Sequence, residues 1–308
     1  ITSSSMLINK FLSGPNEFLA RVRQKTSLPE LHRWFDQIAA LRVMVIGDPV
    51  IDCYRFVSPL GKSEKDSIVT FCEGEGREWV GGPAVVAAHV REICREVVLE
   101  TGQEKGIRKL RYVLAPFGQK LFSVVDHERV GTLLPPLVFD ADMVIVTDFG
   151  HGLIPSPEIA RQIISRSKFL ALTVQYNSLN QGFNLLRKWR HADYVVADEM
   201  ELRLASGSER GELRELAEAE RHRMGARMLA VTLGHRGCIV LDNSGIVEVP
   251  AMADKVVDRL GTGDAFLAMS APLVAVGAPK EVVALVGSVA AGIEAGMIGN
   301  QPVPKASL

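Results

Sequence analysis

Short runs of consecutive apolar residues, each followed by a polar side chain, recur through the middle of the chain. The runs are Leu41–Gly47 before Asp48, Met143–Val146 before Asp148, Phe169–Val174 before Gln175, and Tyr194–Val196 before Asp198. Continuous apolar runs of this length are typical of strands buried on both faces of a parallel sheet. Helical segments separate them, for example 157–166 and 182–190. The alternation predicts an α/β fold with a doubly wound parallel sheet and covering helices.

Two other parts of the chain break this alternation. Residues 15–40 carry apolar side chains at helical spacing and predict two helices, which we treat as an N-terminal extension (1–40) of a domain over 41–308. The stretches 53–79 and 107–130 lack helical periodicity and mix β-forming residues with charge. We expect them to form a separate small β-sheet that covers the active site as a lid. Long surface loops are the alternative.

The last third of the chain predicts a hairpin followed by two buried helices. Met228–Gly234 predicts a strand, Cys238–Leu241 its hairpin partner, and Asp242–Gly245 a turn. A further strand is expected just before Gly261. The small apolar residues from Ala265 onward predict a buried helix, and a second helix is expected over 280–298.

Composition excludes several classes of function. Lys and Arg number 35 against 36 for Asp and Glu, so the net charge is −1, which argues against a nucleic-acid-binding protein. The longest uncharged apolar stretch, Ala265–Pro279, is too short to cross a bilayer as a helix, so no membrane span is expected.

Cysteine usage and the start of the sequence bear on where the protein works. The four cysteines are scattered with no C-x-x-C pair, which disfavours zinc and disulfides and favours a reducing, cytoplasmic location. We expect no signal peptide in the first residues, because Lys10, Pro15 and Glu17 interrupt their apolar run. The sequence begins with Ile1 rather than Met, and we expect it to be part of a longer chain.

The segment Gly261-Thr262-Gly263-Asp264 stands directly before the first buried helix. Its glycines let the backbone approach a ligand, and the unpaired first N–H groups of the helix favour an anion. Asp264 would repel a bound phosphate unless it takes part in the chemistry. It fits a general base for an attacking hydroxyl, with the amides of Gly261, Thr262 and Gly263 as an anion hole for the transferred phosphoryl group. An ordinary Asp helix cap is the alternative.

The segment Asp258–Phe266 resembles the D-T-x-G-A-G-D signature of the PfkB (ribokinase-like) carbohydrate kinases. Other landmarks follow in the family's order from Arg42 to the C-terminus, and they include V-T-L-G-H-R-G at 231–237. The resemblance implies a ribokinase-like fold and phosphorylation of a sugar or sugar-phosphate hydroxyl with ATP and Mg²⁺. It also implies roles for residues at three places: the acceptor (Asp48, Asp52, Gly81 and Gly82), magnesium and phosphate (Asp198 and Glu201), and the nucleotide (Thr232, Gly234 and Gly237).

Within this family, three segments are similar to the bacterial heptose-phosphate kinases of ADP-heptose synthesis. They are Val43–Asp48, Arg108–Arg111 and Thr147–Gly152. The similarity implies a homodimer paired through lid strands and a fused or partner nucleotidyltransferase domain. Lys109 and Arg111 share one face of the expected lid strand. They either reach the substrate, for which Lys109 is a candidate, or are charges that protect an edge strand, which we favour slightly.

Several positions depart from the family pattern. Val85 stands where an Asn is usual, and His151 and the segment 173–177 stand where heptose kinases carry lysines. Fewer residues separate Val85 from Lys109 than a βαβ crossover needs, so residues are expected to be absent between about 90 and 107. These departures favour an alternative function, a weak or inactive module that senses a nucleotide or metabolite. The intact Gly261–Asp264 segment argues against that alternative.

Overall fold

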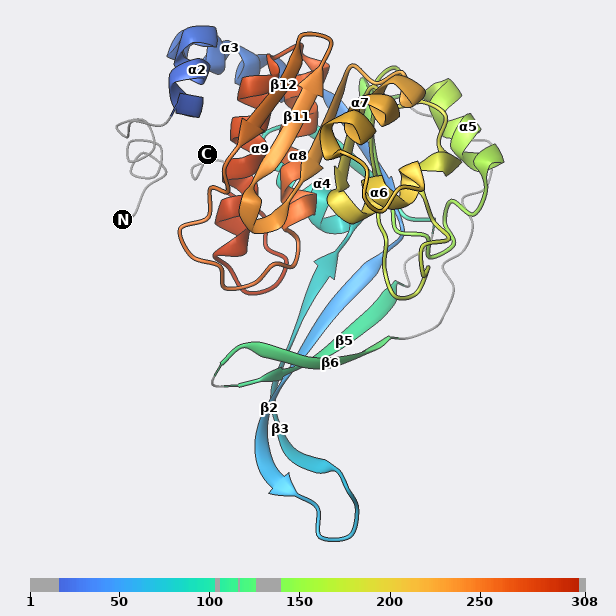
Figure 1. Cartoon of the computed structure of the whole chain (residues 1–308), viewed down its shortest axis with the longest axis vertical. Helices are drawn as coiled ribbons and strands as arrows, with labels where there is room; N and C mark the ends of the chain where they lie inside the picture. Colours follow the sequence, from blue (N-terminus) through green and yellow to red (C-terminus); the bar gives the residue numbers. More distant parts are fainter. Residues whose placement is uncertain (1–16, 103–105, 116, 126–139, 305–308) are drawn as a thin grey trace.

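The computed structural model describes residues 17–102, 106–115, 117–125 and 140–304 (Figure 1). Its strands are β1 (Arg42–Gly47), β2 (Val50–Lys62), β3 (Val69–Gly81), β4 (Glu96–Glu100), β5 (Ile107–Leu114), β6 (Gln119–Val125), β7 (Met143–Asp148), β8 (Leu170–Val174), β9 (Tyr194–Asp198), β10 (Met228–Thr232), β11 (Cys238–Asp242) and β12 (Gly245–Val249). Its α-helices are α2 (Glu17–Lys25), α3 (Leu28–Ala39), α4 (Pro83–Arg91), α5 (Pro157–Arg166), α6 (Glu199–Ser206), α7 (Leu213–Met224), α8 (Thr262–Ala275) and α9 (Lys280–Ala295).

The large sheet has eight strands in the order β12-β11-β10-β9-β8-β7-β1-β4. Every neighbouring pair from β10 to β4 is parallel, and β11 and β12 add an antiparallel hairpin at one edge. Side chains of β7 alternate between two cores: Met143 and Ile145 pack on the face covered by α4, α8 and α9, whereas Val144 and Val146 pack on the face covered by α5, α6 and α7. The expected doubly wound α/β fold is confirmed.

The second sheet has four strands in the order β3-β2-β5-β6 and projects from the body as a lid (Figure 1). β2 pairs antiparallel with β3 and parallel with β5, and β5 pairs antiparallel with β6. The expected small β-sheet is therefore present, and residues 126–130 of the second expected stretch lie outside the described residues. Because β5 lies inside this sheet, Lys109 and Arg111 are not charges on an edge strand.

Two expected elements are wrong, and tertiary hydrogen bonds explain both. The segment 182–190 contains only a short 3₁₀ turn, Leu186–Lys188, because Asn180 and Asn184 donate to backbone carbonyls of other loops. In the described stretch 250–261, no strand leads directly into Gly261. The N–H groups of Val257 and Asp258 instead donate to the carbonyl of Ala295 at the end of α9.

A parallel crossover connects β1 to β4, and the described residues between Val85 and Lys109 contain only the rest of α4, β4 and the start of β5. The chain leaves β1, runs through the lid hairpin and α4, and returns as β4, which pairs parallel with β1. Val85 is buried within α4. All four cysteines are free. Among the described residues, no helix is both long enough and apolar enough to cross a bilayer.

Candidate active site

The glycine-rich segment at the start of α8 has one position, Gly261, that only glycine suits. Gly261 has φ of 82° and is the N-cap of α8. A Cβ atom on Gly261 would lie 2.4 Å from Asn300 Oδ1 and 2.9 Å from Glu294 Oε1. The first N–H groups of α8 therefore open onto a cleft with their position fixed by tight packing, as an anion-binding site needs.

Asp264 lies in the first turn of α8 and borders the same cleft. Burial raises its pKa to about 7, repulsion from Asp52 adds to the rise, and the Lys109 ammonium opposes it. A carboxylate with a pKa near neutral pH can both accept a proton and release it, which is what general base catalysis needs.

The lid brings three more charged groups towards Asp264. The buried Asp52 on β2 forms an ion pair with Arg111 on β5, and Asn300 donates to its other oxygen at 2.8 Å. Lys109, on β5 opposite Asp52, has a pKa lowered by burial, against the attraction of Asp52 and Asp264. Its Nζ lies 5.8 Å from the centre of the Phe149 ring. The predicted acceptor residue Asp52 and the candidate ligand Lys109 thus share one site.

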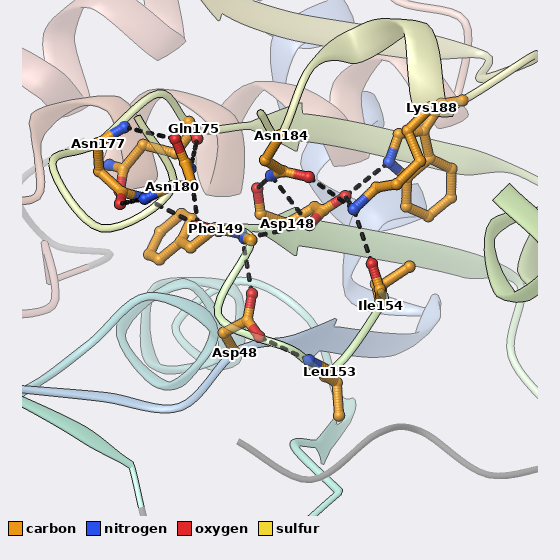
Figure 2. Close-up of polar contacts among 12 residues, drawn as sticks. Asp48, Asp148, Phe149, Leu153, Ile154, Gln175, Asn177, Asn180, Asn184 and Lys188 are labelled. Carbon is orange, nitrogen blue, oxygen red and sulfur yellow. Dashed lines mark hydrogen bonds and ion pairs between the residues drawn. The ribbon is translucent and has the colours of Figure 1, made fainter. Parts of the chain in front are cut away.

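The glycine pair and Asp48 shape the base of this site. A Cβ on Gly81 would lie 2.5 Å from Asp52 Oδ2, and one on Gly82 would lie 2.9 Å from the Phe149 ring. Asp48 is 1 % exposed, and its oxygens accept the N–H groups of Phe149 at 3.0 Å and Leu153 at 2.9 Å (Figure 2). With both oxygens occupied, Asp48 holds the loop after β7 and is not open to the cleft in this conformation.

A buried ion pair fixes the other end of that loop (Figure 2). Asp148, at the end of β7, has no exposed surface and pairs with Lys188 Nζ at 2.5 Å. The Trp189 indole N–H donates to the same carboxylate at 2.8 Å, and Lys188 also donates to Asn184 and to the carbonyl of Ile154. None of these contacts was predicted from the sequence, because residues 184–189 were expected to be helical.

Substituting Lys188→Met is expected to lower the free energy of unfolding by about 3–5 kcal/mol, because it leaves the Asp148 carboxylate buried without its cation. Urea denaturation measures the change. Lys168→Met is the matched control, since Lys168 is exposed and pairs with Asp142 only at 3.5 Å, a contact worth less than about 1 kcal/mol. Equal effects of the two substitutions would contradict the assignment of Lys188 as a buried partner.

Asp198 and Glu201 form a capping box at the start of α6. Asp198 Oδ1 accepts the N–H of Glu201 at 2.7 Å, and the Glu201 oxygens accept the N–H groups of Asp198 at 2.8 Å and Tyr176 at 3.1 Å. Burial raises the pKa of Glu201 to about 8, with repulsion from Asp198 as the second cause. Both residues border the cleft of Asp264, and among the described contacts Asp198 Oδ2 is their one oxygen without a hydrogen bond.

A second cleft adjoins the first and contains the predicted nucleotide residues. Thr232, at the end of β10, borders both clefts, and Gly234 and Gly237 border the second one. Thr262 and Gly263 also border both, so the anion-binding amides lie between the two clefts. Sequence reasoning missed Arg259, which borders both clefts, and Asn300, which packs on Gly261. The sequence offered one signal for Arg259, which is its position inside the glycine motif.

Known proteins resemble this chain in sequence and in fold. The model of the "pfkB family carbohydrate kinase" matches residues 137–305. A "D-beta-D-heptose 7-phosphate kinase" of Bordetella bronchiseptica is 25% identical, covering 89% of this chain and 96% of its own. A "Bifunctional protein HldE" of Rhodospirillum rubrum is 29% identical over 59% of this chain and 39% of its own.

The chain spans only part of the bifunctional relatives, from 33% of that of Magnetococcus marinus to 64% of that of Shewanella baltica. Among solved structures, Arabidopsis thaliana ribokinase, complexed with ribose and ATP, has a TM-score of 0.63 at 18% identity and covers 87% of this chain and 97% of its own. Phosphofructokinase-2 from Escherichia coli has a TM-score of 0.63 at 14% identity and covers 82% of this chain and 93% of its own. At these identities the structural likeness concerns the fold.

Proposed function

Because the chain belongs to the pfkB family of carbohydrate kinases, we propose that it transfers the γ-phosphoryl group of ATP to a hydroxyl of a sugar phosphate, with Asp264 as the general base. The observation that carries this proposal is the position of Asp264. Its carboxylate lies in the first turn of α8, beside the glycine amides, and its pKa is raised to about 7.

In the proposed reaction, Asp264 accepts the proton of the acceptor hydroxyl as that oxygen attacks the γ-phosphorus. The bond from the γ-phosphorus to the ADP oxygen breaks, and Asp264 later releases the proton to solvent. The N–H groups of Gly261, Thr262 and Gly263 stabilise the charge on the transferred group. Thr232, Gly234 and Gly237 contact the nucleotide in the adjoining cleft.

Of Asp198 and Glu201, Asp198 fits a magnesium ion held through water, and Glu201 positions it through the capping box. Three of their four oxygens already accept backbone N–H groups, so Asp198 Oδ2 is the oxygen left for a hydrated ion. Magnesium keeps several waters when it binds at such sites, and when bound it neutralises charge on the nucleotide phosphates. Among the described residues, no group of three or more His, Cys, Asp or Glu side chains is arranged to hold a metal directly.

Charge at the acceptor end favours a phosphorylated sugar, of which a heptose phosphate is the first candidate by the name of the Bordetella relative. His151 does not supply that charge: burial, with Lys109 as a second cause, lowers its pKa to about 3. Lys109 and Arg111 supply cations from the lid instead, although Arg111 is paired with Asp52.

The test is release of ADP from Mg-ATP against a panel of sugars, sugar phosphates and nucleosides. We expect release that depends on one class of acceptor, the sugar phosphates, and disappears without an acceptor. Clear ATP binding by calorimetry with no release for any acceptor would overturn the proposal and favour the sensing module. The relatives named bifunctional are much longer than the part that this chain matches, which supports a second domain, fused or as a partner, for which the nucleotidyltransferase implied by the family resemblance is the candidate.

We further propose that two copies pair through the lid. Large apolar side chains are exposed there, at the hairpin tip and on β6: Leu60, Ile68, Val69, Phe122 and Val124. Exposed patches of this kind are typical of protein interfaces. Light scattering is expected to give twice the chain mass for the native protein and the single-chain mass for Phe122→Glu. A native protein of single-chain mass would contradict this proposal.

A further inference from the structure

Asp258 lies where the lid meets the body, and each of its carboxylate oxygens has one partner on either side. Oδ1 accepts from Lys120 Nζ of the lid at 2.6 Å and from the N–H of Leu260 in the body at 3.1 Å. Oδ2 accepts from the Tyr54 hydroxyl of the lid at 2.5 Å and from the N–H of Gly299 in the body at 3.3 Å. One buried carboxylate thus joins two lid strands to two body segments.

The two body segments are the ones that pack around the anion-binding amides. Leu260 directly precedes Gly261, the N-cap of α8. Gly299 directly precedes Asn300, whose Oδ1 packs on Gly261 and whose Nδ2 donates to Asp52 of the lid. The backbone that positions the anion-binding amides therefore depends on hydrogen bonds to Asp258.

The two lid donors come from strands that are far apart in the sequence. Tyr54 lies on β2 and Lys120 on β6, and the Lys120 Nζ is 5.1 Å from the centre of the Tyr54 ring. The Tyr54 ring also meets Trp79 of β3 edge-to-face at 5.0 Å. Three lid strands therefore converge on this point, and a movement of the lid away from the body would remove both donors together.

The protonation states of Asp258, Lys120 and Tyr54 favour strong hydrogen bonds between them. Burial alone would raise the pKa of Asp258, but the hydrogen bonds from Lys120 and Tyr54 hold it below its usual range. Burial, and then Asp258, raise the pKa of Tyr54, which keeps the phenol protonated as a donor. Hydrogen bonds to a charged group are roughly twice as strong as neutral ones, so losing either donor has a measurable effect.

We propose that Asp258, Lys120 and Tyr54 form a latch that couples closure of the lid over the acceptor to the conformation of the anion-binding loop 259–263. Lid closure supplies two of the four donors to Asp258, and the closed state thereby fixes the N–H of Leu260 and the start of α8. Asp258 is a positioning residue that acts through Leu260 and Gly261. The inference deepens the proposed kinase function and rests on it for its catalytic consequence.

Amide hydrogen exchange tests the coupling without substrate or turnover. Lys120→Met and Tyr54→Phe each remove one lid donor, and Lys25→Met, which changes an exposed lysine at the end of α2 outside the lid, is the matched control. We expect exchange in 119–125 and in 259–263 to accelerate about tenfold in both latch variants and to stay unchanged in the control. Faster exchange in the lid with unchanged exchange in 259–263, at an unaltered Tm, would overturn the coupling.

Kinetics test the catalytic consequence. We expect both latch variants to lower kcat about tenfold with little change in the KM for ATP. The pH below which the rate falls is expected to be the same as in the native protein. An unchanged kcat in both variants would overturn a role in turnover. If the native protein released no ADP with any acceptor, the proposed function would fail, whereas the exchange result would still decide whether the latch exists.

Discussion

Replacing Asp264 with Asn is expected to lower kcat by about 10²- to 10⁴-fold, the range that a general base contributes. The reason is geometric: Asp264 borders the cleft beside the anion-binding amides. In the native protein, kcat/KM for the acceptor is expected to fall about tenfold per pH unit below the Asp264 pKa of about 7, because the protonated acid cannot accept a proton. The residual rate of Asp264→Asn is expected to lack this decline.

The same substitution is expected to stabilise the fold at alkaline pH. The pKa of Asp264 is raised from 3.8 to about 7 in the folded chain, so folding favours the protonated form. Native stability therefore decreases between about pH 4 and pH 7 as the folded state must ionise a partly buried group, and Asp264→Asn avoids this decrease. We expect a gain on the order of 2 kcal/mol at pH 8 and almost none at pH 4.

Thermal unfolding at the two pH values measures this gain. Asp36→Asn serves as the control, since Asp36 is an exposed carboxylate on α3. If Asp264→Asn lost both activity and stability at pH 8, the result would contradict the assignment of Asp264 as the general base, because misfolding would explain the lost activity. If Asp264→Asn stayed active and became more stable, Asp264 would not be the general base.

The sequence was most informative where local pattern and global fold agree. Apolar runs of β1, β7, β8 and β9 predicted the parallel sheet, because such strands are buried on both faces. The Gly261–Asp264 segment predicted the start of a buried helix, and α8 begins at Thr262. In each case neighbouring residues alone decide the structure.

Prediction failed where partners distant in the sequence decide the structure. The 3₁₀ turn Leu186–Lys188 replaces an expected helix because its region bonds to the loop after β7. The charged pattern of Lys109 and Arg111 is compatible with an edge strand, and only the pairing of β6 outside β5 shows otherwise. Likewise, nothing in the sequence around Asp258 indicates that Lys120, 138 residues away, is its partner.

Lys109→Met is expected to lower kcat by about 10²-fold and to raise the KM for the acceptor, because it removes a preorganised cation from the site of charge transfer. Lys109 lies on β5 opposite Asp52, and its ammonium lowers the pKa of Asp264. Without that ammonium, the repulsion between Asp264 and Asp52 is opposed less. The decline of kcat/KM on the acid side is therefore expected to begin at a higher pH than in the native protein.

The pH shift separates a catalytic cation from one that only binds the acceptor. A lysine that acted through binding alone would change KM and leave the pH dependence of the rate where it is. Lys109→Arg keeps the charge and is expected to keep the native pH dependence, whereas Lys25→Met, at the exposed end of α2, is expected to change neither quantity. If Lys109→Met and Lys109→Arg lost activity equally with the same pH dependence, shape rather than charge would explain the role of Lys109, and the proposed electrostatic coupling to Asp264 would be wrong.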